Sequence, residues 1–362
     1  MSETTSIEWC DATFNPWWGC QKVSPACDHC YAERDAKRYQ PGKVLWGVGA
    51  ERRTFGEKHW NEPLRWARTM PAKLGRRPRV FCASMGDWLD LDAPLDQFVR
   101  LLDTIRRTPE LDWLLLSKRI GNWRKRLEQV RDGDLDQVSN ELGHWICDWL
   151  GGHAPATVWL GATVVNQDEA DRDVPKLLLT PARVRFLSIE PMLGPINLAE
   201  MEEDGGDSYL DPLTAWTAEE MTAMWGEPMP AHPRVDWVIC GGESGPHARP
   251  MHPDWVRSLR DQCAAAGVPF LFKQWGEHSM EYDRDRDDPD CRRCGEQDRR
   301  PGRWINLAGG HGFHGERVHY AHRIGKKAAG RLLDGRTHDE FPLTKLHAAE
   351  QEAREPSLFP PT

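Results

Sequence analysis

The clearest pattern in the chain is a series of short, nearly continuous apolar runs bounded by polar residues or glycine. Such runs are typical of strands buried on both faces of a parallel sheet. The six runs are RVFCASM (79–85), DWLLLS (112–117), TVWLGATV (157–164), RVRFLSI (183–189), DWVICG (236–241) and PFLFKQW (269–275).

Helical periodicity occupies the stretches between these runs. Apolar residues recur at three- and four-residue steps from Leu95 to Ile105, and Pro94 suits the first turn of a helix there. Three further helices are predicted over 122–131, 167–179 and 253–266, the last ended by Gly267.

Strands that alternate with helices predict a parallel sheet wrapped by helices, which is a partial or complete β/α (TIM-like) barrel or, as the alternative, a doubly wound open sheet. The position of polar residues favours the barrel, because they follow successive strands where the barrel mouth would lie. These residues are Asp87, Lys118, Arg119, Thr163, Asn166, Glu190, Glu243, Ser244, Lys273 and Gln274. Loop starts are often polar in any protein, so the argument rests on the series rather than on one residue.

Two stretches interrupt the alternation within a single predicted domain over 1–342. We expect insertions at about 200–234 and 277–316, and a C-terminal tail over 343–362. The second insertion carries Cys291 and Cys294 as CRRC, and His278, His311, His314 and His319 follow or flank it. A second metal site is one interpretation, but one CxxC is a weak signal and a mobile loop is favoured.

Composition narrows the class of protein. The 362 residues are 39% hydrophobic, no apolar run approaches the roughly 20 residues that span a bilayer, and MSETTSIEW lacks the regions of a secretory signal. We therefore expect a cytoplasmic protein with no membrane partner, whose ten cysteines are reduced thiols and ligands.

A net charge of -9 argues against a protein that coats nucleic acid nonspecifically. Local basic clusters could still contact phosphates, although solvated faces are the commoner explanation. The clusters are Arg76, Arg77 and Arg79, and Lys118, Arg119, Arg124, Lys125 and Arg126. Among 18 tryptophans, most are expected in the core, whereas Trp17, Trp18, Trp46 and Trp275 fall in loop-like sequence where rings could stack on a planar substrate.

Cys20, Cys27 and Cys30 form the strongest chemical signal. Three thiolates could hold a [4Fe-4S] cluster that leaves one iron open for chemistry, or a structural zinc ion with Cys10 or His29 as fourth ligand. They could also be unconnected thiols.

Several segments carry a resemblance to a known family. They are IEWCDATFNPWWGCQKVSPACDHCYAE, VFCASMGDWLD, LLLSKR, LSIEPMLGP, VICGGESGP, FLFKQWGE and AAGRLLDGRTHDEFP. Together, from about residue 6 to residue 342, they resemble the phage-associated family of three-cysteine-motif proteins predicted to be radical S-adenosylmethionine (SAM) enzymes.

This resemblance implies a radical SAM barrel with the cluster in the loop after the first strand. Cys20, Cys27 and Cys30 would each ligate one iron, and the amine and carboxylate of SAM would chelate the fourth. An electron donor would supply the electron that cleaves SAM to methionine and a 5'-deoxyadenosyl radical. The spacing departs from the commonest motif: six residues, 21–26, separate the first two cysteines where three are usual, whereas the last CxxC is retained.

The resemblance also implies SAM-binding residues at the strand ends. Ser84, Met85, Gly86 and Asp87 would hold the amine, and Lys118 or Arg119 would pair with the carboxylate. Thr163, Asn166 and Glu190 would bind ribose hydroxyls. Gly241, Gly242 and Glu243 would face adenine or substrate. Structural alternatives stand beside each role, such as rim ion pairs for Lys118 and Glu190.

The leading hypothesis is a radical SAM enzyme acting on a nucleobase, nucleotide or nucleic acid in a phage context. A zinc-stabilised nucleic-acid-binding or interaction protein without redox chemistry is the alternative. A metal-dependent hydrolase is a third, but the strand ends lack the histidine pairs that such barrels offer.

Overall fold

A computed structural model of the chain describes residues 5–133, 138–202, 209–216, 223, 233–284, 302–310 and 318–342. All six predicted strands are present in it. They are β2 (Arg79–Cys82), β3 (Asp112–Ser117), β4 (Val158–Thr163), β5 (Val184–Ile189), β8 (Trp237–Gly241) and β9 (Phe270–Gln274). A further strand, β1 (Ala12–Thr13), precedes them and was not among the predicted apolar runs.

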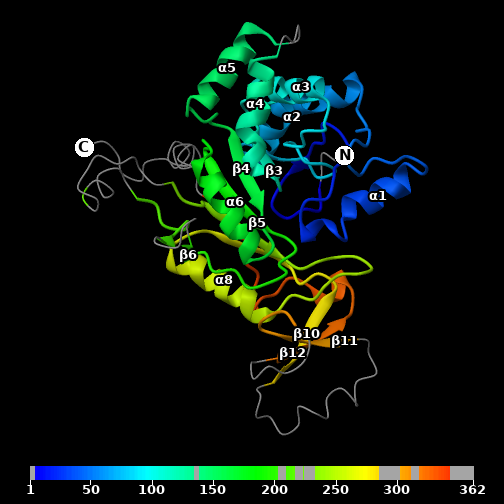
Figure 1. Ribbon diagram of the computed structural model, residues 1–362, viewed down its shortest axis with the longest axis vertical. Coiled ribbons are helices and arrows are strands. Elements are labelled where there is room, and N and C mark those ends of the chain that lie inside the picture. Colours follow the sequence, from blue (N-terminus) through cyan, green and yellow to red (C-terminus); the bar gives the residue numbers. More distant parts are fainter. Residues whose placement is uncertain are drawn as a thin grey trace.

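These strands form a seven-stranded sheet in the order β1-β2-β3-β4-β5-β8-β9, and every pair is parallel. Strand order follows chain order, so the described sheet has no switch point of the kind that a doubly wound fold requires. The sheet curls into a half-barrel with β1 and β9 at its edges (Figure 1). The partial barrel is therefore confirmed, and the complete barrel and the doubly wound alternative are not.

Helices connect the strands. They are α1 (Tyr31–Tyr39), α2 (Glu57–Leu74), α3 (Leu95–Arg106), α4 (Trp123–Arg131), α5 (Asn140–Leu150), α6 (Gln167–Leu179), α8 (Pro253–Ala265) and α10 (Lys326–Ala329), with the 3-10 turns η1 (Pro25–Cys27) and η2 (Ile120–Asn122). The four predicted helices correspond to α3, α4, α6 and α8. Pro94 is the N-cap of α3 rather than a residue of its first turn. Gly267 follows α8 with a φ of 62°, a left-handed conformation that favours glycine and ends a helix.

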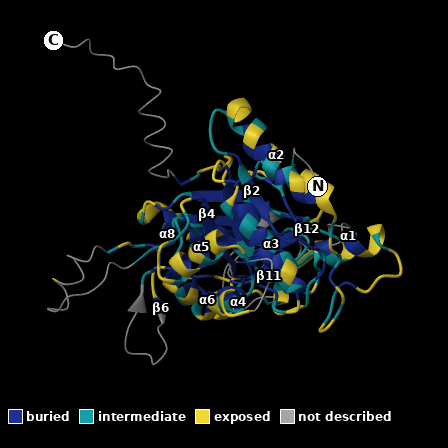
Figure 2. Ribbon diagram, turned by 90° about the horizontal axis from the view of Figure 1, so that it is seen from above, coloured by how far each residue is buried: buried dark blue, intermediate teal, exposed yellow. Residues whose placement is uncertain are grey.

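Each strand sends alternate side chains to two separate cores, as the two-residue period of a strand requires. On the outer face, residues such as Val80, Leu115 and Leu160 pack with the helices. On the inner face, Trp159, Phe186 and Trp237 pack into a second, aromatic cluster. The sheet is thus the buried layer of the molecule, as Figure 2 shows. Most tryptophans lie in the cores, as expected.

The last described segment of the chain closes the inner cluster from outside the sheet. Phe272 N donates to His338 O at 3.0 Å along the free edge of β9. Phe341 then packs on Trp237 with ring centroids 4.9 Å apart, and the guanidinium of Arg79 lies over the Phe341 ring, 3.8 Å from its centroid. The floor of the half-barrel is therefore apolar and filled.

Two small antiparallel sheets include residues of the stretches predicted as insertions, and one strand, Val318–Arg323, lies just beyond the second stretch. One contains β10 (His278–Arg284), β11 (Gly302–Asn306) and β12 (Val318–Arg323) in the order β10-β12-β11, and the other pairs β6 (Met201–Glu202) with β7 (Tyr209–Leu210). The mobile loop expected over 277–316 is wrong for the described part, where backbone pairing between β10, β11 and β12 builds a sheet.

Some expectations fall on residues outside the described ranges. Cys291, Cys294, His311 and His314 belong to this group, as do the 343–362 tail and most of 203–232. Among the described helices, none is both long and apolar enough to cross a lipid bilayer.

Candidate functional site

The predicted site residues lie along one edge of the half-barrel. Because all seven strands are parallel, the loops after them emerge on the same side of the sheet. The loop after β1 carries the three cysteines, and the predicted cofactor-binding residues follow or end the next strands. These are Ser84, Gly86 and Asp87 after β2, Lys118 and Arg119 after β3, Thr163 and Asn166 at β4, Glu190 after β5, and Gly242 and Glu243 after β8.

The cysteine loop is attached to the loop after β2 through the backbone. Gly19 N donates to Met85 O at 3.0 Å, and Gly19 and Gly86 form a parallel bridge. A Cβ on Gly86 would lie 3.2 Å from both Gly19 O and Trp17 Nε1, tighter than most side-chain contacts. Glycine at this position therefore lets two chain segments approach each other, and thereby sets the position of Cys20 relative to β2.

Arg119 links the first cysteine to a buried carboxylate. Its Nη1 donates to Cys20 Sγ at 3.4 Å and to Asp87 Oδ2 at 2.9 Å, while Nη2 donates to Gln21 O at 2.6 Å. The side chains of Arg119 and Asp87 are only 8% and 6% exposed. Burial alone would lower the pKa of Arg119, but Asp87 and Cys20 raise it above its ordinary value. The guanidinium is thus a fixed positive charge beside the sulfur.

The Asp87 carboxylate makes four hydrogen bonds within the protein. Its oxygens accept from Ser117 Oγ at 2.7 Å, from the backbone N–H groups of Leu89 and Lys118 at 3.0 Å, and from Arg119. Such a well-bonded, buried carboxylate holds its neighbours in place. The structure therefore gives Asp87 a positioning role toward Arg119, and the predicted contact of Asp87 with an amine stays a prediction.

Glu243, Arg249 and His29 form a group of contacts, here called the Glu243 clasp, that attaches the cysteine loop to the residues after β8. Glu243 Oε1 lies 3.1 Å from His29 Nδ1 and accepts from Arg249 Nη2 at 2.7 Å, and Glu243 Oε2 accepts from Arg249 Nε at 2.9 Å. Arg249 reaches on to Pro25 O at 2.9 Å and to Asp28 Oδ2 at 3.3 Å. Burial would raise the pKa of Glu243, but Arg249 and His29 hold it below its ordinary value. Glu243 therefore binds the segment that carries Cys27.

The remaining two cysteines lie just before α1. Cys27 ends the turn η1, and Cys30 is the N-cap residue of α1. Burial raises the pKa of Cys20 to about 12 and also raises that of Cys30, on which the backbone of Glu33 and the Lys118 ammonium act in the opposite direction. In the absence of a metal these two thiols are therefore protonated, and metal binding would release their protons.

Three thiols can serve either of the two metal groups predicted from the sequence. A tetrahedral zinc ion would bind all three sulfurs at about 2.3 Å and needs a fourth ligand, whereas a four-iron cluster takes each sulfur on a separate iron. Within the described part of the chain, the group of three side chains that lie close enough to hold one metal ion contains none of these cysteines. The choice between a cluster and a single ion at Cys20, Cys27 and Cys30 stays a prediction.

Three other predicted cofactor-binding residues, Lys118, Thr163 and Glu190, take part in two separate polar contacts. Lys118 Nζ donates to Thr163 Oγ1 at 3.4 Å, and Glu190 Oε1 pairs with Lys273 Nζ at 3.0 Å. A Cβ on Gly241 would lie 2.6 Å from Glu190 Oε1, so glycine makes room for that carboxylate. The rim ion pair offered as the alternative for Glu190 is present.

The rest of the predicted set has structural partners. Asn166 is the N-cap of α6, and its Oδ1 accepts from Glu169 N at 3.0 Å. A Cβ on Gly242 would clash with the carbonyl oxygen of Trp275, so this glycine permits β8 and β9 to meet. Ser84 exchanges hydrogen bonds with the side chain of Asn15, and its carbonyl oxygen accepts from Tyr31 OH at 2.8 Å.

Most of the residues predicted to bind a nucleic acid are also engaged elsewhere. Trp17 is fully buried, the guanidinium of Arg53 covers Trp18 at 4.5 Å, and Trp275 Nε1 donates to Leu332 O. Trp46 is half-buried beside the backbone of Cys20.

The basic clusters have acidic or aromatic partners. Arg76 and Arg79 pair with Asp11, and Arg77 pairs with Asp112. These pairs lie at the amino-terminal ends of the strands, whereas the cysteine loop lies at the carboxyl-terminal ends. Arg126 is buried over Phe98, and Arg124 pairs with Glu128. These contacts favour structural roles for the basic clusters over phosphate binding.

Sequence reasoning missed Asn15, Arg249 and the role of His29. Met85 N donates to Asn15 Oδ1 at 2.7 Å. Asn15, in the loop after β1, therefore holds the loop after β2 in place. No local pattern marks such residues, because their partners are distant in the sequence: His29 and Glu243 are 214 positions apart.

Comparison with known proteins gives one match. The family model described as "Protein of unknown function (DUF5131)" matches residues 4–342. No curated protein and no solved structure matches the chain.

Proposed function

The chain belongs to the DUF5131 family of proteins of unknown function, and we propose that it is a radical SAM enzyme whose Cys20, Cys27 and Cys30 hold a [4Fe-4S] cluster. The observation that carries the proposal is that one loop at the carboxyl ends of the strands of a parallel β/α half-barrel carries all three cysteines, with Arg119 donating to the sulfur of Cys20. Ligands and active sites of parallel β/α folds gather at this edge.

The donor set supports the assignment of an iron-sulfur cluster over one zinc ion. Three thiols match the three protein ligands of a four-iron cluster, whereas a closed zinc site needs four, and among the described residues neither Cys10 nor His29 belongs to a group that could hold a metal ion. Cys10 precedes β1, at the other end of that strand, and His29 is paired with Glu243. A three-thiolate cluster keeps one iron available for SAM.

When bound, the cluster would supply the electron that cleaves SAM to methionine and a 5'-deoxyadenosyl radical. The chain's own residues would set the charge and position of the site. Arg119, held by Asp87, partly offsets the negative charge of the thiolates and donates to one of them. Glu243 and Arg249 hold the loop around Cys27 against β8.

The methionine and ribose groups of SAM have suitable partners on the inner face. Lys118 offers an ammonium for the carboxylate, and Thr163 offers a hydroxyl within 3.4 Å of that ammonium. Glu190 and Lys273 form a polar pair above the aromatic cluster. Because most of the tryptophans and arginines considered for nucleic-acid binding are engaged in the fold, the proposal is confined to SAM and its cleavage.

Metal analysis of the full-length protein tests the cluster assignment. The protein is purified without oxygen and assayed for iron, acid-labile sulfide and zinc, together with Cys27→Ala and the matched variant Cys147→Ala, whose thiol is exposed on α5. We expect iron and sulfide in similar amounts in the wild type and in Cys147→Ala, and their loss in Cys27→Ala. Zinc without iron, or equal iron in all three proteins, contradicts the assignment.

A further inference from the structure

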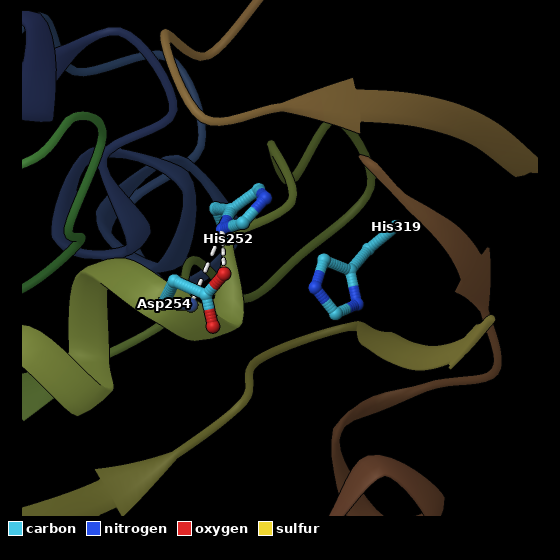
Figure 3. A group of neighbouring side chains, drawn as sticks. All are labelled: His252, Asp254 and His319. Atoms are coloured by element: carbon cyan, nitrogen blue, oxygen red, sulfur yellow. Dashed lines mark hydrogen bonds and ion pairs between the residues drawn. The ribbon is translucent and has the colours of Figure 1, made fainter. Parts of the chain in front are cut away.

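A second group of metal-ligating side chains lies away from the cysteines, where α8 meets the small sheet of β10, β11 and β12. His252 and Asp254 come from the start of α8, and His319 comes from β12. One ligand atom from each of the three side chains lies within 4.8 Å of the others. Figure 3 shows the ring of His319 reaching toward Asp254 and His252 from a separate part of the chain.

These side chains are largely withdrawn from solvent. His252 is 0% exposed and His319 is 3% exposed, and their rings lie 4.7 Å apart at 90°. The two imidazole rings thus meet edge to face and are not stacked. One ring nitrogen of each histidine lies within 4.8 Å of a carboxylate oxygen of Asp254. His252 Nδ1 is 4.0 Å from Asp254 Oδ2. The same Nδ1 accepts from Asp254 N at 3.2 Å, the long end of the normal range for such a bond.

The carboxylate of Asp254 is oriented by an arginine. Arg257 Nη1 donates to Asp254 Oδ1 at 2.8 Å and is itself held by Asp334 at 2.9 Å. Oδ2 is the oxygen on the side of His252. Ligating carboxylates in metal sites are commonly oriented by such an outer hydrogen bond.

We propose that His252, Asp254 and His319 bind one divalent transition-metal ion, zinc above all, and that this ion fastens the three-stranded sheet to α8. Two imidazoles and one carboxylate form a ligand set typical of zinc, whereas magnesium and calcium prefer oxygen ligands alone. Ligand bonds of about 2.0–2.2 Å would bring the three atoms, now within 4.8 Å of one another, to separations of about 3.4 Å, which shortens the distances between them by up to about 1.4 Å. The fourth position remains for water or another donor.

The fold gives such an ion a mechanical role. The two parts that it would join are already in contact: Trp255 Nε1 on α8 donates to Leu307 O after β11 at 2.6 Å. A metal bond to His319 would add a link from β12, the central strand of the small sheet. Metal binding to the folded state alone then raises stability in proportion to the logarithm of the free metal concentration.

Cobalt substitution tests this site separately from the cysteines. Chelator-treated full-length protein is titrated with Co²⁺, because cobalt bound by nitrogen and oxygen shows weak visible bands, whereas cobalt bound by thiolate adds intense near-ultraviolet absorption. The variants are His319→Gln and Asp254→Asn, with His338→Gln as the control, a buried histidine beside Phe270. The second variant keeps the proposal testable if His319→Gln does not fold.

We expect the wild type and His338→Gln to bind about one more ion per chain than His319→Gln and Asp254→Asn, with loss of the weak visible bands and unchanged thiolate absorption in those two variants. Added Zn²⁺ should raise the melting temperature of the wild type and not of His319→Gln. Equal stoichiometry and equal visible bands in all four proteins would overturn the proposal. Neither result bears on iron loading at Cys20, Cys27 and Cys30, which has its own variants.

Discussion

Arg119 bonds to Cys20 Sγ and to the Asp87 carboxylate with the same guanidinium nitrogen, at 3.4 Å and 2.9 Å. One buried ion pair thereby fixes the first cysteine of the loop relative to β2 and β3. The proposed cluster site is therefore built on the sheet itself, and loop residues alone do not determine its geometry.

Removal of the Arg119 side chain should strongly destabilise the fold. Arg119→Ala leaves Asp87 buried without its cationic partner, and we expect a loss of about 3–5 kcal/mol in the free energy of unfolding. The control is Arg124→Ala, because Arg124 is 59% exposed and pairs with Glu128 at 3.7 Å. The control should change stability by less than about 0.5 kcal/mol. Urea unfolding measures both, and similar losses would show that the Arg119–Asp87 pair has no special weight.

Loss of the Glu243 clasp should make the cysteine loop less firmly held. Glu243→Gln removes the charge that holds Arg249 and His29, and we expect destabilisation by about 2–3 kcal/mol together with faster extraction of iron by a chelator. Glu33→Gln is the matched change on α1, because Glu33 pairs with Lys22 and Lys37, which are 50% and 71% exposed. Iron extraction at wild-type rate from Glu243→Gln would contradict the role given to the Glu243 clasp.

Two glycines should respond to alanine in opposite directions. A Cβ at Gly242 would clash with the backbone of Trp275, so Gly242→Ala should cost about 1–3 kcal/mol through displacement of β9. Gly143 lies inside α5 and its nearest neighbour would be 3.9 Å from the new Cβ. Gly143→Ala should therefore stabilise the protein by about 0.5–1 kcal/mol. Thermal unfolding of both variants tests this pair of predictions. A melting temperature of Gly242→Ala above that of the wild type would contradict the close approach of β8 and β9.

A buried histidine should make stability depend on pH. His59 donates from Nε2 to Asn15 O at 2.8 Å and stacks on Phe55, and burial lowers its pKa from 6.5 to about 4. The unfolded chain therefore binds this proton first as the pH falls, so the contribution of His59 to stability is complete above 6.5 and declines toward pH 4.

His59→Gln removes this titration and should reduce the slope of unfolding free energy against pH in that window. His144→Gln, on the exposed side of α5, controls for the loss of a histidine. Urea titrations at a series of pH values give both slopes. An unchanged slope in His59→Gln would mean that this histidine is not held neutral in the folded protein.

Much of the barrel could be predicted from the sequence. The six long strands are continuous apolar runs, since both of their faces are buried, and α6 begins and ends where the periodicity placed it. The two-residue strand β1 is too short to give a pattern. Helix α2 contains Pro63 and Pro71, which disguise its apolar stripe. The small sheet was missed because β10 and β12 are rich in charge and histidine.

The position of the candidate site could be predicted from the sequence, but the contacts that its residues make could not. Parallel strands place their carboxyl ends on one edge, so the rim residues could be grouped from the sequence. Which of these residues have hydrogen-bonding groups available for a ligand depends on partners that are distant in the sequence. The sequence placed Asp87 at the rim, but it gave no sign that Ser117, Lys118 and Arg119 donate to its carboxylate. His252 and His319 gave no shared signal, because they meet only once the small sheet packs near α8.

SAM cleavage is the central claim, and one assay tests it most directly. The protein is prepared without oxygen with its iron and sulfide intact, mixed with SAM and a strong reductant, and analysed for 5'-deoxyadenosine. We predict that the wild type and Cys147→Ala form 5'-deoxyadenosine and that Cys27→Ala forms none. A fully loaded iron-sulfur protein that leaves SAM uncleaved under these conditions would contradict the account.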